Sequence, residues 1–181
     1  DKMIFSLSYQ KFEESRNNRS FQEAQLFQSK EQVDVHTTSI DFERRNRENN
    51  VLFYGAEFLH NRVSSIGSVF DIDSEQREAA ASRYPDGSSW RSLAAYANYQ
   101  WRLDRKLTIQ SGSRYNHIWL DAQFHDQFFN FPFEEAHLST GALTGALGAT
   151  YRPDETWELR ANFSTAFRAP NVDDIGKIFD P

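Results

Sequence analysis

The chain has 181 residues, a formal net charge of −6 and no cysteine. The acidic balance argues against nucleic-acid binding, and the lack of cysteine excludes disulfide scaffolds, thiolate metal sites and cysteine nucleophiles. Mean hydropathy is −0.71, and no stretch approaches the roughly 18 apolar residues of a membrane-spanning helix. Aromatic residues nevertheless make up 15% of the chain. Two interpretations stay open: a soluble all-β module with an aromatic binding face, or part of a transmembrane β-barrel, whose alternating strands keep the mean hydropathy low.

Period-two alternation of apolar and polar residues predicts an all-β fold of antiparallel up-and-down strands, about seven in number. The clearest example runs from Leu93 to Leu103, where odd-numbered residues are apolar and even-numbered residues are mostly polar. Residues 74–83 have a helix-forming composition and are consistent with a short helix in a loop. The predicted strands are residues 3–14, 28–44, 51–72, 90–103, 107–122, 142–152 and 157–168.

The links between these strands alternate in length along the chain. Short links at 45–50, 103–106 and 152–156 alternate with long links at 15–27, 73–89 and 123–141. In an up-and-down barrel this segregation puts short turns on one side of a membrane and long loops on the other. Aromatic residues flank both kinds of link and predict two girdles: Trp101, Tyr151 and Trp157 beside short turns, and Trp90 and Trp119 beside long loops. The alternative is that they form the core of a soluble sandwich.

Residues that could carry chemistry are scattered, and no catalytic or metal-binding motif occurs. The 123–141 loop combines two histidines with several phenylalanines, which could contact haem or an aromatic iron chelate, or could form an aromatic cluster of their own. Polar residues that alternate with apolar ones would face the lumen of a barrel or, in a soluble domain, water: Arg114, Asn116, Arg160, Asn162 and Arg168.

The C-terminal run from Asn162 to Lys177 contains Phe167-Arg168-Ala169-Pro170. With its context, this run resembles a signature of TonB-dependent outer-membrane receptors. Three shorter stretches are similar to the same family: Tyr54-Gly55-Ala56-Glu57, Gly112-Ser113-Arg114-Tyr115 and Leu147-Gly148-Ala149-Thr150-Tyr151-Arg152-Pro153. The run from Arg83 to Trp90 is similar to versions in Bacteroidetes-type receptors.

The resemblance implies a barrel of about 22 strands with a plug domain and a TonB box. Neither is recognised here, so we expect residues 1–181 to be an incomplete barrel domain. The receptor would lie in the bacterial outer membrane and would import a scarce nutrient, such as an iron-siderophore or haem, with energy from TonB. Its partners would be the nutrient, outer-membrane lipid and, through the plug, the TonB complex. We expect no enzyme activity, cofactor or metal, and we expect the isolated piece to self-associate through its edge strands.

Two groups of residues follow from this interpretation. The first would contact ligand from the long loops: Arg83, Tyr84, Trp90, His125, Phe128, Phe129, Phe131 and His137. The second would be structural, because Pro170 would end strand pairing and redirect the chain: Phe167, Arg168, Ala169, Pro170 and Asn171.

Overall fold

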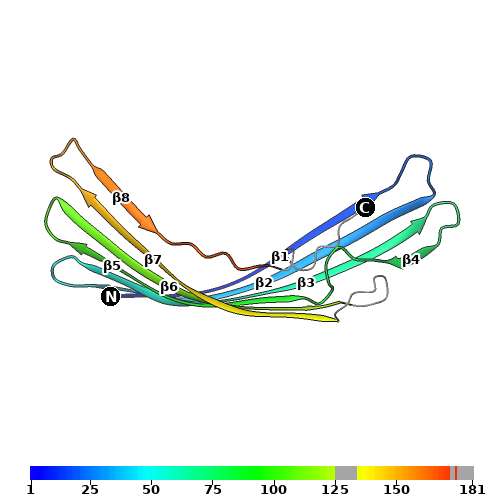
Figure 1. The fold of residues 1–181 in the computed structure, drawn as a ribbon, viewed down its shortest axis with the longest axis horizontal. Coiled ribbons are helices and arrows are strands. Elements are labelled where there is room, and N and C mark those ends of the chain that lie inside the picture. The colour runs from blue at the N-terminus through cyan, green and yellow to red at the C-terminus, as the bar shows by residue number, and fades with distance from the viewer. Residues whose placement is uncertain (125–133, 172–173, 175–181) are drawn as a thin grey trace.

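A computed structural model of the chain describes residues 1–124, 134–171 and 174. These residues form one antiparallel sheet of eight strands, which Figure 1 shows as a single curved layer. The described residues therefore do not build the two packed sheets of a sandwich. They also include no helix that is long and apolar enough to cross a membrane.

The strands follow one another across the sheet in chain order, as the up-and-down prediction requires. Their order is β1-β2-β3-β5-β6-β7-β8, and the short strand β4 pairs with β3 outside this path. The bounds are β1 Lys2–Asn18, β2 Gln25–Arg45, β3 Val51–Asp71, β4 Arg77–Ala80, β5 Ser89–Arg102, β6 Leu107–Gln123, β7 Glu135–Tyr151 and β8 Leu159–Ser164.

Several predicted elements differ from the structure. Strand β1 ends at Asn18 and β2 begins at Gln25, so the link predicted as long at 15–27 spans only residues 19–24 and is similar in length to the short links. The helix considered at 74–83 is wrong, since Arg77–Ala80 is a strand that pairs with the end of β3; long-range pairing overrides the local helix propensity. Strand β7 begins at Glu135 rather than at residue 142, because it pairs along the whole length of β6. Strand β8 ends at Ser164, four residues earlier than predicted.

Each of the three short turns is held by one Asn or Asp side chain near its start. The side-chain oxygen accepts hydrogen bonds from backbone N–H groups two to four residues further on, which is how such residues stabilise turns. These bonds also lower the pKa of the Asp104 carboxyl. The bonds run from Glu48 and Asn50 to Asn46 at 3.0 and 2.9 Å, from Lys106 and Leu107 to Asp104 at 2.6 and 2.7 Å, and from Thr156 and Trp157 to Asp154 at 2.8 and 3.0 Å.

Two further hydrogen bonds, each donated by a backbone N–H, tie neighbouring short turns to one another. The buried Asn50 accepts a bond of 2.8 Å from the backbone N–H of Arg102, and the N–H of Arg152 donates to the carbonyl of Lys106 at 2.7 Å. The short turns therefore form one continuous edge of the sheet, opposite the edge that carries the long links (Figure 1).

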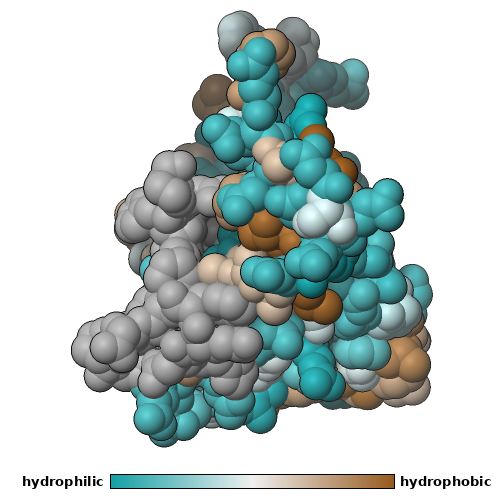
Figure 2. Space-filling view, turned by 90° about the vertical axis from the view of Figure 1, so that its right-hand side faces the viewer, coloured by the Kyte–Doolittle hydropathy of each residue, from teal (hydrophilic) through white to brown (hydrophobic). Residues whose placement is uncertain are grey.

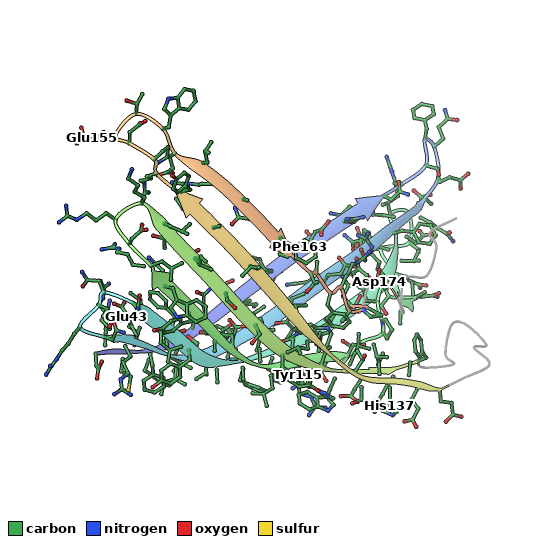
Figure 3. All side chains as sticks on the ribbon, turned by 60° about the vertical axis from the view of Figure 1, so that its left-hand side comes forward. Glu43, Tyr115, His137, Glu155, Phe163 and Asp174 are labelled. Atoms are coloured by element: carbon green, nitrogen blue, oxygen red, sulfur yellow. The ribbon has the colours of Figure 1, made fainter. Side chains whose placement is uncertain are left out.

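The register puts apolar side chains together on the convex face of the sheet. Even-numbered residues of β2 and β3 and odd-numbered residues of β1, β5, β6 and β7 share this face. Figure 3 shows Tyr115 on its underside. Along β3 the apolar residues on this face run from Leu52 to Phe58, and His60 follows at the margin. Leu52 to His60 spans about 27 Å of strand and about 20 Å of depth at a tilt of about 40°, close to the roughly 25 Å band of outer-membrane barrels.

Aromatic residues mark both margins of this band. Near the short turns, the rings of Phe42 and Tyr54 stack at 5.0 Å, and those of Tyr99 and Trp101 meet edge-on at 4.5 Å. Near the long links, His117 lies 4.4 Å from Trp119. Such rows are typical of the aromatic girdles at a membrane interface.

A row of charged and titratable residues follows beyond the aromatic margin that lies next to the long links. The register aligns Lys11, Asp34, Arg62, Asp121 and His137 across the sheet. The preceding ladder step already mixes rings with polar groups, since it aligns Tyr9, His36, His60, Arg91, Trp119 and Ser139. The convex face therefore changes from apolar to charged over two ladder steps at this margin of the band. Figure 2 looks onto the long-link end, where hydrophilic residues dominate.

Candidate ligand-binding site

The concave face carries an apolar core at its long-link end. Val63, Leu120, Ala122 and Phe124 are buried there, and Val33, Tyr84, Trp90, Ala136 and Leu138 pack against them. Elsewhere the concave face is mainly polar. The apolar core is therefore a local feature of this face, and another segment must shield it from water.

Residues 81–88 lie over this core and shield it. This segment leaves the sheet after β4 and folds back on β3 before β5 begins. The N–H of Val63 donates to Ser88 at 2.8 Å and its carbonyl accepts from Gly87 at 3.0 Å. The N–H of Ser65 donates to the Asp86 carboxylate at 2.9 Å. Gly87 has φ +79°, a conformation that favours glycine and lets the segment turn back toward the sheet.

A cavity of about 640 Å³ lies between this segment and the concave face. Its apolar wall consists of Phe12, Val33, Val63, Tyr84 and Trp90. Its polar wall consists of Glu13, Glu14, Glu31, Asn61 and Asn171. Three carboxylates and three aromatic side chains thus meet in one space, formed by β1, β2, β3, β5 and two segments outside the strands.

Two of the three carboxylates already have cationic partners. Glu14 accepts a bond of 2.6 Å from Arg16, which lowers the pKa of Glu14, at a position beyond the apolar band. Glu13 pairs with Lys30 at 2.9 Å. Glu31 is different, because only 6% of the residue is exposed and neither carboxylate oxygen has a hydrogen-bond partner.

Two further polar atoms of the cavity residues are buried without a partner. They are Oδ1 of Asn61, an acceptor, and Nε1 of Trp90, a donor. Native proteins pair nearly all of their buried polar groups, and an unpaired one costs about 1–3 kcal/mol. With the two oxygens of Glu31, the cavity therefore offers three acceptor atoms and one donor to an occupant.

The structure brings together some of the predicted ligand-contacting residues. Tyr84 and Trp90 both line the cavity, and the Arg83 guanidinium lies 5.1 Å above the Tyr84 ring. His137 lies on the convex face (Figure 3), bonded to Asp121 at 2.9 Å and close to Glu135 at 3.2 Å. His125, Phe128, Phe129 and Phe131 lie outside the described residues.

The structure corrects the prediction that Trp90 belongs to the aromatic girdle beside the long loops. The prediction grouped it with Trp119, but Trp90 points to the concave face and lines the cavity. Trp90 is even-numbered and therefore shares a face with the polar residues of β5, whereas Leu93 and Tyr99 point to the other face. Strict application of the alternation would have placed Trp90 on the concave face. Glu31 and Asn61 were not singled out, since neither stands out from the polar residues around it.

The concave face also carries the predicted lumen-facing residues. Arg114 forms an ion pair of 2.7 Å with Glu57 and lies 5.4 Å over the Tyr96 ring. Asn116 accepts a bond of 3.0 Å from Ser92. The register puts Arg160 and Asn162 on the same face. Arg168 lies beyond the last strand and bonds Asp174 at 2.8 Å.

The predicted structural motif leaves the sheet earlier than expected. The last bonds to β7 are made at Thr165, whose N–H donates to the Gly145 carbonyl at 2.9 Å and whose hydroxyl accepts from the Gly145 N–H at 2.8 Å. Pro170 therefore does not end the pairing. Asn171 and Asp174 bond each other reciprocally, backbone N–H to side chain, at 3.0 and 2.9 Å.

Comparison with known proteins gives a consistent result. A family model described as TonB dependent receptor-like, beta-barrel matches residues 2–179. Among solved structures, the chain is similar to the ferric citrate transporter FecA in its unliganded form, with a TM-score of 0.57 and 17% identity. The match covers 88% of this chain and 24% of that one, so the chain spans about a quarter of that transporter. No curated protein matched the sequence.

Proposed function

Because the chain belongs to the TonB-dependent receptor β-barrel family, we propose that it forms part of the wall of a receptor that imports a scarce nutrient across the bacterial outer membrane. Residues 1–181 would be one arc of an incomplete barrel domain. A plug domain and a TonB box elsewhere in the receptor would couple import to TonB.

The observation that carries this proposal is the opposite character of the two faces of one sheet. The convex face has an apolar band between two aromatic margins and a charged row beyond it. The concave face has ion pairs, amides and a cavity at the long-link end. A wall between lipid and a polar lumen requires this distribution.

The cargo would be bound from the long-link side, where Tyr84 and Trp90 line the cavity. An iron chelate, haem or a similar nutrient is the proposed cargo. The family's transport role and the lack of a recognised catalytic motif both favour a transporter over an enzyme.

Deleting the gene tests the proposal. The deletion strain would be grown under limitation with ferric citrate, a ferric hydroxamate, haemin or cobalamin supplied alone. We expect growth to fail on one of these, to fail likewise when TonB is removed, and to return when the intact gene is supplied. Normal growth on all four, or recovery of the receptor outside the outer-membrane fraction, would contradict the proposal.

A further inference from the structure

Glu31 presents a buried carboxylate with no hydrogen-bond partner in the described chain. It lies toward the long-link end of β2, opposite Glu14 on one side and Ser65 on the other. It is 6% exposed, and both oxygens lack a partner. A buried carboxylate is strongly unfavourable unless a cation or hydrogen-bond donors compensate it.

The nearby cationic side chains donate no hydrogen bond to Glu31, although the charge of Arg16 acts on it. Arg16 donates to Glu14 at 2.6 Å, and Lys30 pairs with Glu13 at 2.9 Å. The Ser65 hydroxyl accepts from the N–H of Tyr84 at 3.2 Å. Hydrogen-bond donors for Glu31 must therefore come from outside these side chains, and an occupant of the cavity can supply them.

The rest of the cavity specifies the chemistry of an occupant. Beside the carboxylate, the unpaired Oδ1 of Asn61 is a second acceptor. Phe12, Tyr84 and Trp90 supply apolar and aromatic surface. Acceptors beside aromatic rings favour a cation with N–H donors and a flat apolar part, since rings also attract cations through their faces. Apolar walls and an indole N–H suit a bare metal ion poorly.

We propose that this cavity binds an organic cation, an ammonium or guanidinium group joined to a flat apolar group. Glu31 and Asn61 accept its N–H bonds, and Trp90 and Tyr84 cover its apolar part. The inference deepens the proposed import function and rests on it, because the cation would be the cargo or the part of the cargo that the receptor recognises. The unpaired carboxylate disfavours an anionic ligand at this position.

Three probes with the same ring and different charge test the proposal. Benzamidine is a cation, benzamide is neutral and benzoate is an anion at pH 7. Binding to the full-length receptor in detergent micelles would be measured by titration calorimetry. We expect affinity to fall in the order benzamidine, benzamide, benzoate. Equal affinities, no benzamidine binding, or tightest binding of benzoate would each overturn the proposal.

Variants connect the binding to the named residues. Glu31→Gln keeps the shape and removes the charge, so we expect benzamidine affinity to fall about ten-fold or more. Glu43→Gln, on the same strand and face but beside a short turn (Figure 3), should leave the affinity unchanged. Trp90→Phe keeps a ring, removes the indole N–H and should weaken binding less. An unchanged affinity in a correctly folded Glu31→Gln receptor would refute the assignment.

The growth assay separates this inference from the proposed function. A receptor that supports TonB-dependent growth but does not bind benzamidine would refute the cation site and leave the import function intact. Benzamidine binding that depends on Glu31, in a receptor whose deletion affects no nutrient, would refute import and support the site.

Discussion

The assignment of the convex face to lipid predicts the effect of a charge at Leu147. This residue lies on β7 in the apolar band, opposite Ser111 and Phe163, with 57% of its surface exposed. It is four residues from Tyr151, which puts it about 10 Å from the short-turn margin for a tilted strand and near the middle of the band. Leu147→Arg therefore puts a guanidinium in hydrocarbon.

The magnitude has two parts. An arginine on the lipid face near the bilayer centre costs about 2–4 kcal/mol. Losing the leucine adds about 1–2 kcal/mol. A fully buried leucine side chain contributes roughly 1.5–3 kcal/mol, and a little over half of the Leu147 surface would face lipid. We expect Leu147→Arg to lower the free energy of unfolding by about 3–6 kcal/mol, measured by urea unfolding of the receptor in lipid vesicles.

The preceding residue on the strand provides the matched control. Ala146 lies on the concave face, opposite Gly112 and Ser164, where an arginine can extend into the lumen. Ala146→Arg should change the free energy of unfolding by less than about 1 kcal/mol. If the two variants were equally destabilised, or if Leu147→Arg had no effect, the assignment of the faces would be wrong.

Two further predictions concern close packing and a turn. A Cβ on Gly55 would lie 2.5 Å from the backbone oxygen of Ile40, so Gly55→Ala should cost about 1–3 kcal/mol in urea unfolding; Gly145→Ala, whose nearest atom is 3.6 Å away, is the tolerated control, and equal costs would contradict the packing argument. The folded-state pKa of Asp104 is lowered by backbone N–H donors, first that of Lys106, so its stabilisation is present above about pH 4, the unfolded value, and is lost as the pH falls through the folded pKa. Asp104→Asn should flatten the acid limb of the thermal midpoint between about pH 5 and 3, and an unchanged limb would show that this turn bond does not contribute.

The strand pattern was predictable because alternation is local. Residues 93–103 show which side chains share a face, and the link lengths show how the strands follow one another. The predictions failed where pairing with a distant strand decides the structure. Arg77–Ala80 is a strand only because the end of β3 offers a partner, and the start of β7 at Glu135 depends on the length of β6.

The cavity was only partly predictable for a related reason. Tyr84 and Trp90 stood out as aromatic residues next to a long loop. Glu31 did not stand out, since its importance comes from its burial near a segment about fifty residues further along the chain. It also depends on Arg16 and Lys30 pairing with Glu14 and Glu13 instead. Neither property is encoded near Glu31 in the sequence.

The side-chain bonds in the short turns have a consequence for how the sheet assembles. Asn46, Asp104 and Asp154 each close a hairpin with groups that lie within four residues, so β2–β3, β5–β6 and β7–β8 require little loop-closure entropy and can form early. The contacts of residues 81–88 do not belong to these hairpins. Because these contacts fasten the segment to Val63 and Ser65 of β3, the segment that closes the cavity can settle only after the β2–β3 hairpin has formed.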